Sequence, residues 1–191
     1  MPVNNNANAH LSIEQALDQF IERWYQEKSD NDPKALEMDY DSEWPSSCFL
    51  QIDNKEQGAM YQWQPQKQAA QDMFERLSDA LETPIHPDLI AYYTRYWSYH
   101  LSAHSEEGEL ELLQVWNQQD MERLRGNLLG HALDQKKRKL PLSFFFAITF
   151  PDEGMLCINN DNGEVWYEMP GKKPVRKIAD NLSDFLQRLN P

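Results

Sequence analysis

The stretch LSFFFAITF, at residues 142–150, constrains the fold more than any other part of the chain. It is a nearly continuous apolar run of strand length, which predicts a strand covered on both faces in the centre of a sheet. Two shorter strand-like runs follow it, MLCIN at 155–159 and EVWYEM at 164–169. The NDNG turn between them contains Asn162–Gly163, a strong hairpin signal because both residues tolerate positive φ. We therefore expect a central strand followed by a hairpin.

Helical periodicity appears on both sides of these strands. Apolar residues recur at three- and four-residue spacing in four segments, 11–25, 69–82, 120–138 and 178–189. Ser12 and Gln15 have the spacing of a capping box, which predicts the start of the first helix. The run 88–104 begins with helical character and becomes strand-like near Tyr96. A second strand candidate, 108–115, follows the SEEG turn.

The order of these elements indicates the fold class. Helices at both ends with hairpins between them predict an α+β (mixed α/β) single domain, with a mainly antiparallel sheet and flanking helices. A length of 191 residues suits one domain, which we place at residues 11–191. Residues 1–10, MPVNNNANAH, have neither apolar periodicity nor charge, and we expect a flexible tail there.

Charge narrows the class of partner. The 31 acidic residues exceed the 18 basic ones and give a formal net charge of -13, which disfavours binding to nucleic acid or to anionic lipid. A basic cluster, Lys136 to Lys139, lies in the last turns of the helix expected at 120–138. There it offsets the negative end of the helix dipole. The acidic field favours a basic protein segment as partner, and the alternative is that acidity only keeps the protein soluble.

Catalytic, cofactor and metal sites are not expected. Cys48 and Cys157 are far apart and form no CxxC or Cys/His spacing, which fits a reduced, cytosolic compartment. The histidines show no HExxH spacing, and His100 and His104 are interpreted as ordinary packed or exposed residues. No glycine-rich phosphate loop occurs. No secretory signal and no apolar run of about 20 residues is apparent, so a soluble, non-enzymatic protein is expected.

Four sequence blocks resemble a known family. They are YQWQP at 61–65, IHPDLIAYYT at 85–94, the long block from LLQVW to KLP at 112–141, and NDNGEVW at 160–166. Together they resemble the Syd family of SecY-interacting proteins from gamma-proteobacteria, and the resemblance extends from about Leu11 to Asn190.

The resemblance implies both a fold and a function. It implies one α/β domain of the superfamily that contains the Smi1/Knr4 proteins, and no enzymatic activity. It also implies a peripheral factor on the cytoplasmic side of the inner membrane that contacts basic cytosolic loops of SecY and monitors or stabilises the translocon. Membrane association would then be indirect, through SecY. The family's contact surface is expected to be a concave, electronegative groove.

Clustered acidic residues are the candidates for lining such a groove. Negative charge is concentrated in one short region that follows the SEEG turn and enters the next helix, and a second acidic pair flanks the NG turn. Trp116 is added because an aromatic ring can hold Lys or Arg stems beside carboxylates. The predicted partner-binding residues are Glu106, Glu107, Glu109, Glu111, Trp116, Asp120, Glu122, Asp161 and Glu164.

Two other interpretations stay open at this point. An acidic protein of this size is also suited to an immunity-type inhibitor of a basic toxin or nuclease, and members of the wider superfamily resemble toxin-neutralising proteins. An enzyme that uses Glu109 and Glu111 as an acid–base pair is the weaker alternative, because nothing in the sequence predicts a pocket that excludes water.

Overall fold

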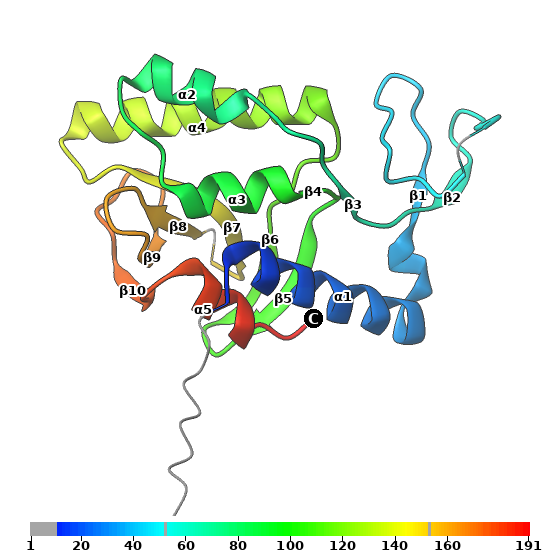
Figure 1. Ribbon diagram of the computed structural model, residues 1–191. Coiled ribbons are helices and arrows are strands. Elements are labelled where there is room, and N and C mark those ends of the chain that lie inside the picture. The colour runs from blue at the N-terminus through cyan, green and yellow to red at the C-terminus, as the bar shows by residue number, and fades with distance from the viewer. Residues whose placement is uncertain (1–10, 52, 153) are drawn as a thin grey trace, which may run out of the picture.

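The computed structural model describes residues 11–51, 53–152 and 154–191, so the tail expected at residues 1–10 lies outside the described residues. Within these ranges the protein is an α+β domain, as predicted, built on an antiparallel sheet of six strands in the order β10-β9-β8-β7-β6-β5 (Figure 1). The strands are β5 (Leu101–Ser105), β6 (Gly108–Leu112), β7 (Ser143–Phe150), β8 (Met155–Asn159), β9 (Val165–Glu168) and β10 (Arg176–Ala179).

Helices and two short ribbons surround this sheet. The helices are α1 (Ile13–Asn31), α2 (Met73–Leu81), α3 (Pro87–Arg95), α4 (Gln118–Arg138) and α5 (Leu182–Arg188), with a 3-10 turn η1 (Pro33–Leu36). The ribbons pair β1 (Glu37–Asp39) with β2 (Met60–Gln62) and β3 (Gln66–Lys67) with β4 (Tyr96–Trp97). The β1–β2 ribbon lies to one side of the main sheet in Figure 1.

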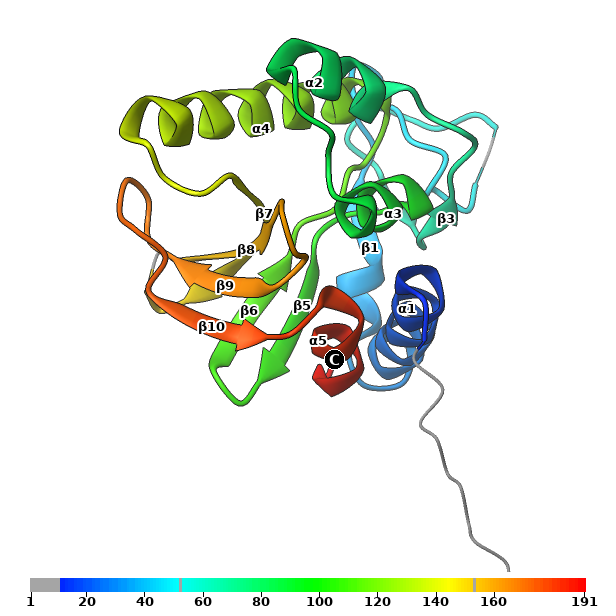
Figure 2. The same cartoon turned by 60° about the vertical axis from the view of Figure 1, so that its left-hand side comes forward.

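Strand β7, which lies within the apolar run of residues 142–150, is central and has helices on both of its faces. The ring of Phe146 contacts Tyr92 of α3 at 5.6 Å and Phe185 of α5 at 5.7 Å between centroids. The ring of the preceding residue, Phe145, contacts His131 of α4 at 5.6 Å. Successive side chains of a strand point to opposite faces, so α3 and α5 cover the inner face and α4 covers the outer face. Figure 2 shows the curl of the sheet between these helices.

The structure corrects the expected C-terminal helix. Residues predicted to form its first turn belong instead to β10, which pairs with β9 and places Ile178 and Ala179 in the core. The helix begins only after Asn181, whose side chain accepts a 2.8 Å hydrogen bond from the backbone nitrogen of Asp184. Apolar spacing alone could not distinguish a buried strand end from a helical turn.

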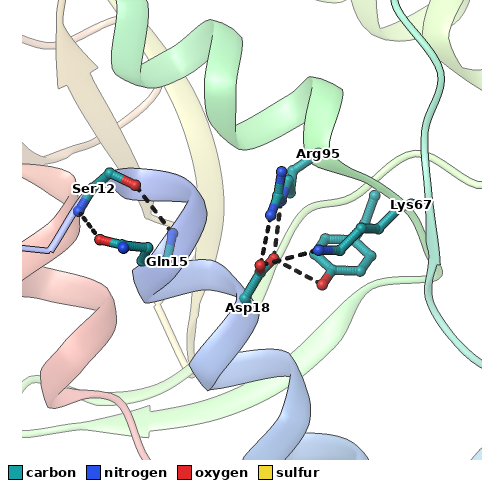
Figure 3. Close-up of polar contacts among 6 residues, drawn as sticks. Ser12, Gln15, Asp18, Lys67 and Arg95 are labelled. Atoms are coloured by element: carbon teal, nitrogen blue, oxygen red, sulfur yellow. Dashed lines mark hydrogen bonds and ion pairs between the residues drawn. The ribbon is translucent and has the colours of Figure 1, made fainter.

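Asp18 adds an ionic connection between the N-terminal helix, whose apolar side is packed in the core, and the rest of the domain. The capping box of Ser12 and Gln15 forms as predicted and starts α1. One turn later, Asp18 accepts hydrogen bonds from Arg95 Nε at 2.9 Å and from the Tyr96 hydroxyl at 2.8 Å, and it pairs with Lys67 Nζ at 3.2 Å (Figure 3). The hydrogen bonds from Arg95 hold the pKa of Asp18 well below its usual range.

We predict that Asp18→Asn lowers the free energy of unfolding at neutral pH by about 1–3 kcal/mol, since it removes a partly buried charge from three partners. The depressed folded-state pKa means that the stabilisation is fully present above about pH 4 and is lost as the pH falls through the folded-state pKa. The deficit of the variant should therefore narrow only as the pH falls below about 4, as measured by urea unfolding.

Glu22→Gln is the matched control, because it removes one negative charge from an exposed position one turn further along the same helix. It should change the unfolding free energy by less than about 0.5 kcal/mol. A deficit of Asp18→Asn that stays constant with pH would contradict the assignment.

Candidate functional site

The open part of the sheet's outer face carries two of the predicted carboxylates. On β6, Glu109 lies between His104 of β5 and Phe150 of β7, and Glu111 lies between Ser102 and Ile148. Both carboxylates point away from the buried residues Leu110 and Leu112, as strand alternation requires.

We call this region the acidic sheet face and define it by Glu109, Glu111, Ile148, Phe150 and Met155. Met155 completes it because β8 pairs Met155 with Ile148. Helix α4 contacts the other end of β7, where Gln135 bonds to Ser143, and it leaves this end uncovered. The Glu109 side chain is 71% exposed and Phe150 is 48% exposed. An accessible carboxylate thus lies directly across from an accessible aromatic ring.

Two histidines accompany the carboxylates. His104 Nε2 lies 3.7 Å from Glu109 Oε1, and His100 Nδ1 lies 3.7 Å from Glu111 Oε2. Both distances are too long for direct hydrogen bonds. The two glutamates therefore keep acceptor oxygens available for an incoming cation.

The β5–β6 turn adds charge next to this face, at a cleft that Phe150 also lines. Glu106 and Glu107 are in the turn that was predicted from SEEG. Glu107 Oε1 lies 3.9 Å from Arg176 Nη1, and both residues line a cleft of about 360 Å³ with Asp152 and Tyr167. Arg176 offsets part of the negative charge there, so this cleft is less acidic than the turn sequence alone implies.

At the start of α4, Trp116 packs in the core and Asp120 forms hydrogen bonds within the chain. Trp116 is 3% exposed, and its ring centroid lies 5.3 Å from that of Phe49 and 5.6 Å from that of Trp63. Asp120 Oδ2 accepts a 2.9 Å hydrogen bond from the Trp116 backbone nitrogen, and its own backbone nitrogen donates to Asn117 Oδ1. Asn117 and Asp120 have capping-box spacing, a sequence signal that would have identified this role.

Glu122 is also engaged within the chain. It bonds to Arg76 of α2 and accepts a hydrogen bond from Arg125 Nε at 3.1 Å. The hydrogen bonds from Arg76 lower the pKa of Glu122 to about 2. A basic partner would have to displace these arginines, so Glu122 is better suited to joining α2 and α4.

The remaining pair, Asp161 and Glu164, belongs to a different region. Glu164 accepts hydrogen bonds from Lys177 Nζ at 2.5 Å and from Trp166 Nε1 at 3.0 Å. The β8–β9 turn follows Asn159, which pairs with Ser143 at one end of β7, whereas the β5–β6 turn lies near Phe150 at the other end. Eight strand residues separate the two turns by roughly 25 Å. The nine predicted residues therefore do not share one surface.

The basic cluster has the structural position expected for it. Lys136 to Arg138 form the last turn of α4, and Lys139 caps the helix in the left-handed region. Lys136 Nζ donates to the carbonyl oxygen of Leu81 at 2.6 Å, and Arg138 Nε pairs with Asp134 at 2.9 Å. Two of the four cations, Lys136 and Arg138, are therefore engaged by groups of the same chain.

Sequence reasoning missed a second acidic–aromatic site. The guanidinium of Arg123 lies 4.0 Å from the ring centroid of Trp44, and both line a pocket of about 420 Å³ with Asp41 and Glu43. The signal was the DYDSEW stretch, in which acidic residues alternate up to a tryptophan. Arg123 already covers the face of the Trp44 ring, where a cation of a partner would otherwise bind. Phe150 and Met155 were also missed, because strand register is needed to place them beside Glu109 and Glu111.

The described residues contain no helix that combines the length and apolarity needed to cross a membrane. Residues 14–191 match the family model described as Syd protein (SUKH-2). The chain is 34% identical to the Protein Syd of Pseudoalteromonas atlantica over 180 residues, which cover 94% of this chain and 96% of that protein. It is 38% identical to the Protein Syd of Shewanella loihica over 183 residues, covering 92% and 81% of the two chains.

We predict that Trp116→Ala lowers the free energy of unfolding by about 3–5 kcal/mol, because it opens a cavity in an aromatic cluster. Phe150→Ala should cost less than about 1 kcal/mol, because nearly half of that side chain is already in water. Urea unfolding followed by circular dichroism measures both. Equal costs would mean that Trp116 is not a core residue.

Proposed function

The chain belongs to the Syd protein family, and we propose from this that it binds basic cytoplasmic loops of SecY through the acidic sheet face. In this proposal the protein is a peripheral factor at the cytoplasmic side of the inner membrane and reaches the membrane only through SecY. Binding, without catalysis, lets it monitor or stabilise the translocon.

The observation that carries the proposal is the placement of Glu109 and Glu111 beside an exposed Phe150. Carboxylates attract Lys and Arg head groups, and an aromatic ring accepts their aliphatic stems and favours a cation above it. This combination suits a basic peptide better than a phosphate or an apolar ligand. The acidic sheet face is thus a narrower site than the groove of nine residues expected from the sequence.

The partner's chemistry fits the field of the whole molecule. Cytoplasmic loops of membrane proteins carry an excess of Lys and Arg. A protein of net charge -13 therefore attracts them electrostatically at long range. Such steering weakens as salt screens it, over about 10 Å at 0.1 M ionic strength. We therefore expect binding that is strongly salt-dependent.

The edge of the sheet suggests how the peptide lies. At β5, His104 and Asn190 exchange backbone hydrogen bonds of 2.8 and 3.0 Å, so the C-terminal segment already occupies that position of the edge. A loop is therefore expected to cross the face and contact side chains, and not to extend the sheet by strand addition at His104.

We predict that Glu109→Lys/Glu111→Lys weakens binding to SecY-containing membrane vesicles by about 10- to 100-fold at low salt. The control is Asp79→Lys/Asp161→Lys, which makes the same change in net charge at exposed positions on α2 and in the β8–β9 turn. The control should weaken binding to the vesicles by less than about threefold, because it alters only long-range attraction. Sedimentation with vesicles, with and without SecY, measures both variants over a salt series.

Equal losses in the two double variants would overturn the placement of the site and leave only a general charge effect. Binding that does not respond to salt would overturn the electrostatic mechanism. A toxin or nuclease inhibitor would use the same face, so pull-downs from cytosol and from membranes separate the alternatives. Enrichment of a soluble basic enzyme, with no SecY, would favour the inhibitor.

A further inference from the structure

The outer face of the sheet carries a second cluster of polar residues, buried under α4. It consists of His131 from α4, Cys157 from β8 and Glu168 from β9. One ligand atom from each residue, a ring nitrogen, the sulfur and a carboxylate oxygen, lies within 4.8 Å of the other two. No two of these residues are close in the sequence, so only the tertiary fold assembles them.

Strand register and the α4 contact explain the convergence. Glu168 is paired with Met155, two residues before Cys157 on β8, so the two side chains point to the same face of the sheet. On the other side of β8, Cys157 is paired with Phe145, and the ring of Phe145 is the one that His131 contacts. His131 therefore lies above Cys157 and Glu168.

Two residues of the cluster are buried, and a polar atom of the third, the partly buried His131, has no partner among the described residues. Cys157 is 0% exposed and Glu168 is 3% exposed. Nε2 of His131 is buried and has no hydrogen-bond partner among the described residues. A buried polar atom without a partner costs free energy, whichever ring nitrogen carries the proton.

A neutral hydrogen-bond network accounts for only part of this arrangement. Glu168 is hydrogen-bonded to the Ser143 hydroxyl and to the Cys157 thiol, and Ser143 Oγ accepts a 2.6 Å bond from Gln135 Nε2. Burial raises the pKa of Cys157 and of Glu168, and it lowers the pKa of His131. Each of these shifts favours the uncharged form of its group. This network provides no hydrogen-bond partner for Nε2 of His131 among the described residues.

We propose that His131, Cys157 and Glu168 form a binding site for a zinc ion, with His131 Nε2, Cys157 Sγ and one Glu168 carboxylate oxygen as ligands. Imidazole, thiolate and carboxylate are the ligand types that Zn²⁺ takes in proteins. Ligand atoms around tetrahedral zinc are about 3.5 Å apart, so the side chains must close by about 1 Å.

Charge balance supports a divalent cation. On binding, the Cys157 thiol releases its proton to solvent, and its thiolate and the ionised Glu168 carboxylate together supply the two negative charges that neutralise Zn²⁺. The Ser143 hydroxyl remains to orient Glu168, and a water or an added group completes the fourth position. The ion would join α4 to β8 and β9, beside the acidic sheet face.

We predict that the full chain, stripped with a chelator and dialysed, takes up one Zn²⁺ or Co²⁺ per chain at micromolar free metal. The Co²⁺ form should show a thiolate-to-metal charge-transfer band. Zinc should raise the unfolding midpoint by about 5–10 °C when its free concentration is about 100-fold above the dissociation constant. Cys157→Ser should abolish the band, and His131→Gln should weaken metal affinity by at least about tenfold.

Cys48→Ser is the matched control, because Cys48 is the other cysteine of the chain and is equally buried. The band should persist in Cys48→Ser, which identifies Cys157 as the thiolate even if Cys157→Ser fails to fold. His100→Gln/His104→Gln should keep the stoichiometry of one. The proposal is overturned by wild-type protein that takes up no metal, by uptake without a charge-transfer band, or by a band that is lost in Cys48→Ser.

Discussion

The fold depends on covering both faces of β7. A strand with Phe144, Phe145 and Phe146 in succession cannot leave either face in water without a large loss of apolar burial. Helices α3 and α5 therefore pack on the inner face, and α4 packs on the outer face. The aromatic ladder from Tyr92 through Phe146 to Phe185 shows how completely the inner side is filled.

The outer face divides into two environments because α4 covers only one end of it. Under the helix, Cys157 and Glu168 are buried beside His131, and burial raises the pKa of the thiol and of the carboxyl. Beyond the helix, Glu109 and Glu111 are on the same face, next to an exposed Phe150. One face of the sheet thus carries a buried acidic residue and two accessible ones. Met155 lies between the two regions, because it pairs with Ile148 on one side and with Glu168 on the other.

Much of the architecture could be predicted from local patterns. Local sequence patterns predicted the central strand, the two hairpin turns and the capping box of α1. Four sequence blocks indicated the family. Strand β10 could not be recognised, because its apolar pair Ile178 and Ala179 also fits a helical spacing. The surroundings of the acidic residues could not be predicted, since the sequence does not distinguish an exposed glutamate such as Glu109 from one bonded to arginines, such as Glu122. Only tertiary contacts separate the two cases.

The joining of α1 to distant parts of the chain has a consequence for synthesis. Asp18 of α1 bonds to Arg95, 77 residues later, and the hydroxyl of Ser183 at the start of α5 donates to the carbonyl oxygen of Leu11 across 172 residues. The first helix therefore leaves the ribosome long before its partners exist. Segments made early, such as Trp63 beside Trp24, can cover part of its apolar side, but that side is fully covered only after α5 has been made, near the end of translation.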